Sequence, residues 1–297
     1  MPDSDFNPAP APATSAPPKR GERMIGAILI DAGRLRPDDV ERILRSQREK
    51  GLRFGDAAIQ LRLLTPADID FALSRQFDYP YLRRGDNTVS EDVVAAHAPF
   101  SPKVEALREV RSRLMVRWFD VNPANKVLAV VSAERKEGRS FIAANLAVVL
   151  SQLGKRTLLI DADLRNPSQH RLFNLDNGGG LSETLAGRGK LEMIKSIAPL
   201  RNLSLLPSGT LPPNAADLLA RPLLARLLQD LVTRFEFIIV DTPAAQGFAD
   251  AQTIAAHAGA ALIVALRNTS RISQVRGLAT NLADAKATVV GTVLNDV

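Results

Sequence analysis

The chain has 297 residues, is 45% hydrophobic and carries 38 Lys and Arg residues against 32 Asp and Glu residues, a formal charge of +6. Its length allows two domains, the absence of cysteine excludes disulfides and thiolate metal sites, and no run has the roughly 20 apolar residues of a membrane span. No zinc-finger, RNA-binding or recognition-helix pattern accompanies the basic charge, so we predict that the protein does not bind nucleic acid.

Residues 1–21 are rich in proline and alanine and have few large apolar side chains. This composition cannot bury enough apolar surface to form a core, and it is typical of a disordered segment. We expect a disordered lead before the first domain.

Residues 22–84 contain an internal repeat. Seven residues recur 29 positions later, with Gly26, Ile30, Leu35, Pro37, Asp39, Leu44 and Gln47 found again as Gly55, Ile59, Leu64, Pro66, Asp68, Leu73 and Gln76. Identities at a single offset predict two stacked copies of one small helical unit. Pro37 and Pro66 mark a helix start in each copy, because a proline in the first helical position loses no hydrogen bond. Thr65 is placed to cap the second of these helices.

Residues 85–100 are mainly polar or small, and we interpret them as a linker. The helix expected at 103–118 carries Glu105, Arg108 and Arg111 on neighbouring turns. Taken alone, this spacing indicates a solvated helix face with ion pairs along it.

A strand, a glycine-containing loop and a helix follow one another after residue 126. Residues 127–131 form a short apolar run, Gly138-Arg139-Ser140 form a turn, and helical spacing continues over 145–153. Backbone N–H groups and the helix dipole bind phosphate at such a junction. We therefore predict a phosphate loop of the Walker A type and a nucleoside triphosphate ligand.

Two further strands end in acidic residues. The apolar run 157–160 leads to Asp161 and Asp163, and the run 237–240 leads to Asp241. A single aspartate after a strand is more often a cap or turn residue. At the carboxyl edge of a parallel sheet, however, a phosphate-bound Mg²⁺ needs oxygen ligands of this kind. Together with the phosphate loop, the three carboxylates indicate a metal site.

Strands and helices alternate through the rest of the chain, with further strands expected at 203–206, 261–266 and 288–294. Their apolar residues are continuous rather than alternating, which indicates strands that are buried on both faces. For residues 101–297 we predict an α/β fold with a mainly parallel sheet and helices on both faces, preceded by the small helical repeat domain.

Four segments of this part of the chain, DADLRNPSQHRLF, GLSETLAG, LPSGTLPPNAADLL and IIVDTP, stand in the order of a known family. They make it resemble the bacterial tyrosine kinases of exopolysaccharide assembly, which are relatives of the chromosome- and septum-partitioning ATPases. The implied fold is that of the P-loop NTPases. Within the family, the chain looks most similar to the kinases that are paired with a chain-length-determinant membrane protein.

The resemblance implies a site for ATP and Mg²⁺. The residues that would bind the nucleotide are Glu137, Gly138, Arg139, Ser140 and Phe141. The Mg²⁺ ligands would be Ser140, Asp163 and Asp241, and the catalytic residues would be Asp161, as the proton acceptor for a hydroxyl nucleophile, together with Asp163 and Arg139. Glu105, Arg108 and Arg111 match the family's ExxRxxR motif, which is associated with assembly into a homo-oligomer.

The sequence departs from the family pattern in the phosphate loop and in its tyrosines. Arg139 replaces the family's lysine, and its planar fork cannot repeat a lysine's point contact with the phosphates. Lys136 stands in a Pro-Gly position, where a positive φ would cost about 1 kcal/mol. The family's tyrosine-rich tail is missing, so we expect the acceptor tyrosine on a partner unless Tyr79 or Tyr81 serves.

Residues 22–84 resemble the N-terminal module of type II secretion and pilus ATPases, some of which bind cyclic di-GMP. The first copy keeps the family's glycine as Gly33, whereas the second has Arg62 there and keeps Arg53-Phe54-Gly55. The resemblance implies either a cyclic di-GMP site, with Arg53 as the guanine contact, or a plain protein-docking module.

The combined hypothesis is a cytoplasmic, ATP-binding, tyrosine kinase-like protein with an altered Walker A loop. It would control exopolysaccharide chain length and export, and would lie at the inner membrane through its chain-length-determinant partner. Two alternatives remain open. One is a non-catalytic regulator that senses nucleotides through the altered loop. The other is a partitioning-type ATPase, which is disfavoured because Glu134 stands where that type carries an extra lysine.

Overall fold

A computed structural model describes residues 24–76, 82, 86–188, 191–198 and 200–296. The chain divides into two compact units, Met1–Tyr79 and Pro80–Val297. Residues 1–21, for which the sequence predicts disorder, lie outside the described residues, as do Tyr79 and Tyr81. Among the described helices, none has both the length and the apolar character required to span a bilayer.

The described part of the N-terminal unit, residues 24–76, forms two helix pairs, one from each copy of the repeat. Its helices are α1 (Ile25–Asp31), α2 (Pro37–Lys50), α3 (Phe54–Gln60) and α4 (Pro66–Gln76). Pro37 and Pro66 are the first residues of α2 and α4, as predicted. The predicted cap is also present, because the Thr65 hydroxyl accepts a hydrogen bond from the Asp68 amide at 3.3 Å while the Asp68 carboxylate accepts one from the Thr65 amide at 2.9 Å.

The two copies keep the same backbone geometry where their sequences differ. Gly33 follows α1 with φ of 68°, and Arg62, at the equivalent position after α3, has φ of 55°. The left-handed region suits glycine and costs another residue roughly 1–2 kcal/mol. The buried residues of both copies form one shared core, which includes Leu29, Ile43 and Phe71. The burial of this shared core therefore compensates for the cost of the positive φ at Arg62.

The described part of the second unit contains one seven-stranded, mainly parallel sheet. The strand order is β3-β4-β2-β5-β1-β6-β7, and only the β3–β4 pair is antiparallel. The strands are β1 (Val127–Ser132), β2 (Thr157–Asp161), β3 (Lys195–Ser196), β4 (Leu203–Leu206), β5 (Phe237–Asp241), β6 (Ala260–Leu266) and β7 (Thr288–Asn295). This confirms the predicted fold class and the strands expected from apolar runs. The short β3 has no such run, so it was not predicted.

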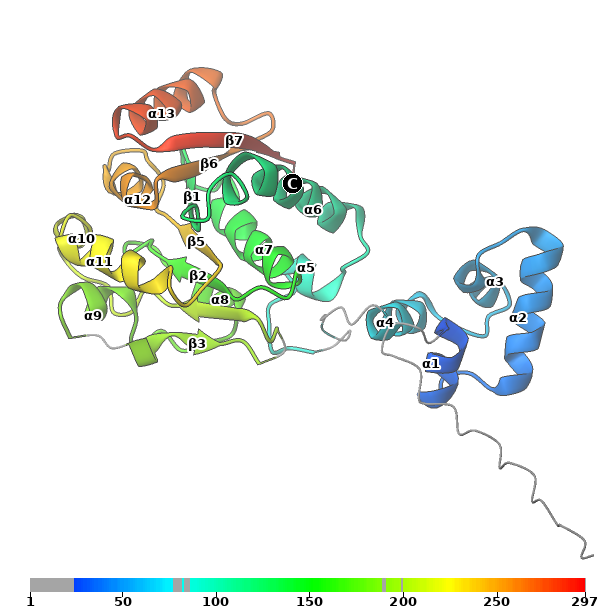
Figure 1. Cartoon of the computed structure of the whole chain (residues 1–297). Coiled ribbons are helices and arrows are strands. Elements are labelled where there is room, and N and C mark those ends of the chain that lie inside the picture. The colour runs from blue at the N-terminus through cyan, green and yellow to red at the C-terminus, as the bar shows by residue number, and fades with distance from the viewer. Residues whose placement is uncertain (1–23, 77–81, 83–85, 189–190, 199, 297) are drawn as a thin grey trace, which may run out of the picture. The chain divides into compact units, whose positions relative to one another are not determined.

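Helices cover both faces of this sheet (Figure 1). The residues of β1 alternate between two cores, with Leu128 and Val130 facing one and Ala129 and Val131 facing the other. The first core is closed by α5 (Val94–His97), α6 (Pro102–Leu114) and α7 (Arg139–Ser151). The second is closed by α9 (Leu181–Leu185), α10 (Ala215–Leu219), α11 (Pro222–Leu231), α12 (Asp250–Ala258) and α13 (Ile272–Asp284). The remaining helices are α8 (Gln169–Leu172), a π-helical turn at Met115–Phe119 and a 3₁₀ turn at Leu191–Met193.

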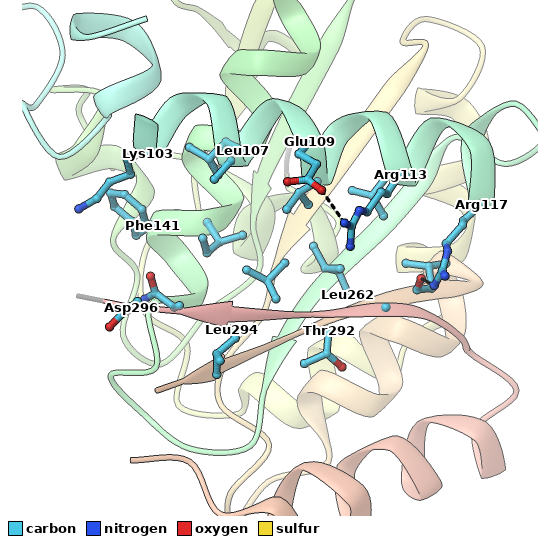
Figure 2. Close-up of a pocket in the computed structure, with 18 residues that line it drawn as sticks. Lys103, Leu107, Glu109, Arg113, Arg117, Phe141, Leu262, Thr292, Leu294 and Asp296 are labelled. Carbon is cyan, nitrogen blue, oxygen red and sulfur yellow. Dashed lines mark hydrogen bonds and ion pairs between the residues drawn. The ribbon is translucent and has the colours of Figure 1, made fainter. Parts of the chain in front are cut away.

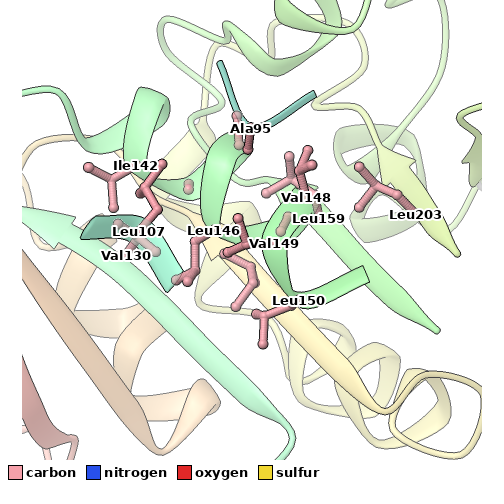
Figure 3. Close-up of a cluster of buried hydrophobic side chains, with 14 of the residues drawn as sticks. Ala95, Leu107, Val130, Ile142, Leu146, Val148, Val149, Leu150, Leu159 and Leu203 are labelled. Carbon is pink, nitrogen blue, oxygen red and sulfur yellow. The ribbon is translucent and has the colours of Figure 1, made fainter. Parts of the chain in front are cut away.

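Helix α7 is buried along most of its length. Figure 3 shows Ile142, Leu146 and Val149 of this helix packed among side chains of the strands and of α5 and α6. The helix begins at Arg139, directly after Gly138, and so includes residues that precede the predicted helical stretch at 145–153. Because the helix begins where the phosphate loop ends, the burial of the helix fixes the position of that end of the loop.

The segment 85–100 was predicted to be a linker, and its described part, residues 86–100, packs against α7. Val89, Val93 and Ala95 are buried there. The side chain of Asn145 accepts a hydrogen bond from the Ala95 amide at 2.8 Å and donates one to the Asp92 carbonyl at 3.1 Å. The polar composition of the segment masks this docking, because only a few small apolar side chains and backbone groups make the contact.

Candidate functional site

The phosphate loop links β1 to α7 and has two residues with positive φ. Lys136 has φ of 65° and Gly138 has φ of 88°. A Cβ atom at Gly138 would lie 2.0 Å from the side-chain nitrogen of Asn295, at the end of β7. The same nitrogen donates to the Glu137 carbonyl at 3.2 Å. Asn295 of β7 therefore packs directly against the loop. Position 138 requires glycine because its φ is positive and because a side chain there would collide with Asn295.

Glu137 holds the loop from within. Its carboxylate accepts a hydrogen bond from the Glu134 amide at 2.8 Å and another from the Ser270 hydroxyl, and the residue is 2% exposed. Glu137 is one of the residues predicted to bind the nucleotide. In this structure its side chain is already engaged, which leaves only its backbone available to a ligand.

The three predicted acidic residues lie close together at the carboxyl edge of the sheet. Asp161 and Asp241 are paired in the register of β2 and β5, and both are fully buried. Asp161 accepts hydrogen bonds from the amides of Ser168 at 3.0 Å and Gln169 at 2.9 Å. Asp163 is 5% exposed and lies two residues beyond the end of β2. The three acidic residues predicted from the sequence thus meet in space, although only Asp163 is partly accessible.

Arg139 turns inward between these carboxylates. Its Nη2 lies 3.2 Å from Asp163 Oδ2, its Nε lies 3.3 Å from Asp241 Oδ1, and its Nη1 donates to the Ser132 hydroxyl at 2.8 Å. The residue is 9% exposed. The loop arginine therefore neutralises part of the acidic cluster instead of pointing into solvent.

Burial shifts the proton equilibria of the two innermost carboxyl groups. Burial and the negative charge of Asp241 raise the pKa of Asp161 to about 8, although the Gln169 and Ser168 amides oppose the shift. Burial also raises the pKa of Asp241, against the lowering effects of Arg139 and of hydrogen bonds from Gln169 and Ser140. Both carboxyl groups therefore hold their protons to a higher pH than an exposed aspartate does.

A cavity of about 340 Å³ opens beside the loop, a size within the range of small-molecule sites. Gly138, Arg139, Ser140, Phe141 and Asp163 line it, as do Arg135 and Lys136 of the loop and Arg165 after β2. Among the residues predicted to bind the nucleotide or the metal or to act in catalysis, Glu137, Asp161 and Asp241 do not line it. A ligand in this cavity would thus meet Asp163 directly, whereas Asp161 and Asp241 are fully buried and Asp241 is paired with Arg139.

Arg165 forms part of the cavity wall and is held on two sides. It pairs with Asp250 at 2.7 Å, and its guanidinium lies 3.7 Å from the ring centroid of Phe248. The hydrogen bond from Arg165 to Asp250 raises the pKa of the arginine. Its charge is therefore largely balanced by Asp250, whereas the loop cations Arg135 and Lys136 are exposed.

A larger cavity, about 490 Å³, lies between α6 and β7. Figure 2 shows Leu107 and Leu262 beside it, with Glu109 and Arg113 of α6 paired. Its lining is mainly apolar, and among the loop and helix-start residues that the sequence analysis assigns to the nucleotide only Phe141 reaches it. The smaller cavity is therefore the candidate site.

The ExxRxxR residues of α6 make contacts within the second unit. Arg108 pairs with Glu105 at 2.8 Å and donates to the Pro99 carbonyl, and Arg111 donates to the Val149 carbonyl at 2.9 Å. These contacts bind the arginines to their own chain, and their role in a homo-oligomer stays a prediction. Arg53 is exposed just before α3, and the cyclic di-GMP site also stays a prediction.

The phosphate loop, the buried helix after it and the acidic strand ends define a P-loop NTPase. The family model that matches residues 123–296 is ParA, described as "NUBPL iron-transfer P-loop NTPase". Tyrosine-protein kinase YwqD of Bacillus subtilis (strain 168) is 33% identical over 207 residues, which are 70% of this chain and 86% of that protein. The kinase domain of Escherichia coli tyrosine kinase ETK has a TM-score of 0.65 and 31% identity, and covers 69% of this chain and 80% of that chain. The chain belongs to the family of bacterial tyrosine kinases.

Some relatives are much longer than this chain. The putative tyrosine-protein kinase EpsB of Ralstonia solanacearum is 32% identical over 203 residues, which are 68% of this chain and 27% of that protein. The chain therefore matches little more than a quarter of that relative's length.

Membership of this family implies the use of a nucleotide and Mg²⁺ in general. The arrangement of this site does not fit a divalent ion, because the facing oxygens of Asp163 and Asp241 are paired with Arg139. Within the described part of the chain, no group of three or more His, Cys, Asp and Glu side chains is arranged to hold a metal. Ser140, Asp163 and Asp241 can serve as metal ligands only after Arg139 has moved.

Two residues of the site were not singled out from the sequence. Gln169 bridges the two halves of the site, donating to the Ser140 carbonyl at 3.0 Å and to Asp241 at 2.7 Å. It lies in DADLRNPSQHRLF, one of the segments that carry the family resemblance, so the resemblance could have pointed to it. Asn295 supports the loop from a strand far along the chain, and no local pattern could reveal that contact.

Proposed function

We propose that the chain is an ATP-binding tyrosine kinase-like protein that regulates exopolysaccharide chain length and export. It acts in the cytoplasm, at the inner membrane, beside a membrane chain-length-determinant protein. The observation that carries the ATP site is the cavity at the phosphate loop, which brings backbone amides, Ser140 and Asp163 together. Family membership supports the kinase activity, and the exopolysaccharide role follows from the resemblance of the sequence segments.

The phosphates of ATP fit the N-terminal end of α7, a 13-residue helix. Amides at a helix start bind anions. Arg135 and Lys136 line the same cavity, and no hydrogen bond or ion pair to another described residue occupies them. These loop cations therefore supply attraction to the triphosphate at the cavity mouth.

The reaction is an in-line transfer of the γ-phosphoryl group. The bond from the γ-phosphorus to the bridging oxygen breaks and ADP leaves, while a bond forms from the phosphorus to a tyrosine oxygen. The tyrosine proton passes to a carboxylate. We assign this step to Asp163, which lines the cavity, rather than to Asp161, whose oxygens accept backbone amides. Cations of the loop stabilise the charge on the transferred group.

Radiolabelled ATP tests this proposal on the full chain. With a Glu–Tyr copolymer as acceptor, label on tyrosine supports the kinase. Asp163→Asn should abolish most of the transfer, whereas Asp230→Asn, at an exposed position of α11, should leave it unchanged. Released phosphate without labelled tyrosine would favour the partitioning-type ATPase instead. Absence of ATP binding would refute the site.

The inward position of Arg139 favours one second candidate, a non-catalytic regulator that senses nucleotides. An arginine held by two buried carboxylates stabilises a closed site. In that case ATP would bind without phosphoryl transfer or hydrolysis and would change only the affinity for a partner. Calorimetry against ATP, together with the labelling assay, separates the two functions. A parallel titration with cyclic di-GMP tests the N-terminal module, in which Arg53→Ala should remove binding.

A further inference from the structure

The guanidinium of Arg139 lies where two carboxylates face each other. Its two nitrogens are 3.2 Å from Asp163 Oδ2 and 3.3 Å from Asp241 Oδ1, and both aspartates are almost completely buried. Removing one partner of such a buried group leaves the other charge uncompensated. Arg139 can therefore leave only when another group compensates these carboxylates.

A divalent ion bound here would need the same oxygens of Asp163 and Asp241 as ligands. Mg²⁺ requires oxygen ligands at about 2.0–2.1 Å in near-octahedral geometry. The oxygens that point at Arg139 are the ones that Asp163 and Asp241 would have to offer to a metal. The guanidinium and the ion cannot be accommodated there together.

Arginine is better suited to this position than lysine. A guanidinium presents several donors in a rigid plane, so Arg139 contacts Asp163, Asp241 and Ser132 at the same time. A lysine is a compact point charge on a flexible stem and cannot bridge the three groups in that way. The replacement of the family's lysine by Arg139 thus changes the behaviour of the carboxylates as well as the contact with phosphate.

We propose that Arg139 and a divalent cation are alternative occupants of the space between Asp163 and Asp241, so that this chain binds the triphosphate of ATP without a requirement for Mg²⁺. The inference rests on the proposed ATP site. Positive charge that can attract the triphosphate comes from Arg135 and Lys136, because both line the cavity and neither is paired with another described residue. Arg139 lines the same cavity while it pairs with both carboxylates, so a triphosphate there can meet the loop cations with the guanidinium in place.

The test compares nucleotide affinities of the purified full chain with and without the metal. A fluorescent ATP analogue is titrated in excess Mg²⁺ and in excess EDTA. The wild-type affinities should agree within about threefold, and Arg139→Lys should bind at least about tenfold more tightly in Mg²⁺ than in EDTA. Arg226→Lys, an exposed arginine of α11, is the matched control and should keep the wild-type ratio. Manganese alone, followed by electron paramagnetic resonance, should remain unbound by the wild-type chain.

Three results would overturn the inference. These are a wild-type affinity that falls at least about tenfold in EDTA, an unchanged ratio in Arg139→Lys, or tight binding of manganese by the wild-type chain without nucleotide. If the analogue binds in neither condition, the ATP site itself is refuted and the inference falls with it. The manganese and EDTA measurements on the wild type decide the question even where the variant is unstable.

Discussion

The docking of residues 86–100 onto α7 makes a specific prediction for Asn145→Ala. The Asn145 side chain is fully buried and makes three hydrogen bonds, from the Ala95 amide at 2.8 Å, to the Asp92 carbonyl at 3.1 Å and to the Phe141 carbonyl at 2.9 Å. Phe141 lies within α7 and keeps a helical partner. The amide of the buried Ala95 loses its partner, and a buried polar group left unpaired costs roughly 1–3 kcal/mol, whereas Asp92 is exposed and its carbonyl can accept from water. We expect the free energy of unfolding to fall by about 1–3 kcal/mol.

Urea unfolding followed by tryptophan fluorescence measures this change. Trp118 is the single tryptophan of the chain and lies in the second unit, where its indole donates to the Val127 carbonyl at 3.0 Å. Its signal therefore reports the unfolding of that unit without interference from the other. Asn281→Ala, at an exposed position of α13, should change the stability by less than about 0.5 kcal/mol. If Asn145→Ala shifts the stability no more than this control does, the segment is not held as described.

Three further changes test the phosphate loop and the acidic cluster. Gly138→Ala should destabilise the second unit by about 1–2 kcal/mol more than Gly154→Ala does in urea unfolding. Both positions have positive φ, but only at position 138 would the added Cβ collide with Asn295. Equal losses of stability in the two variants would refute this close approach. Lys136→Gly should raise the free energy of unfolding by about 1 kcal/mol, because glycine adopts a positive φ without strain. Calorimetry should record weaker ATP binding by the same variant. A lower free energy of unfolding would contradict the strain at position 136. The raised pKa of Asp161 means that the folded chain keeps a proton that the unfolded chain loses. Stability should therefore decline between about pH 4 and about pH 8, by at most about 1.4 kcal/mol per pH unit, and Asp161→Asn should lack this component. Equal pH slopes for Asp161→Asn and wild type would disprove it.

Much of the architecture was predictable because its signals are local. The apolar runs that end at residues 131, 160 and 240 are short and continuous, a pattern typical of strands covered on both faces. Pro37 and Pro66 mark helix starts through a missing N–H group, which is a property of the residue itself. The acidic residues at the ends of β2 and β5 meet because neighbouring parallel strands end at one edge. Each of these inferences needs only the residue types and their spacing.

The tertiary structure decided which groups are accessible and which are paired. Asp161 and Asp163 are two residues apart, yet one is enclosed by the amides of Ser168 and Gln169 while the other lines the cavity. The direction of Arg139 depends on the distances to two carboxylates from different strands, and the shape of the loop depends on Asn295. Such contacts join residues that are far apart in the chain. They arise from packing and from the cost of burying an unpaired polar or charged group, so no pattern of neighbouring residues contains them.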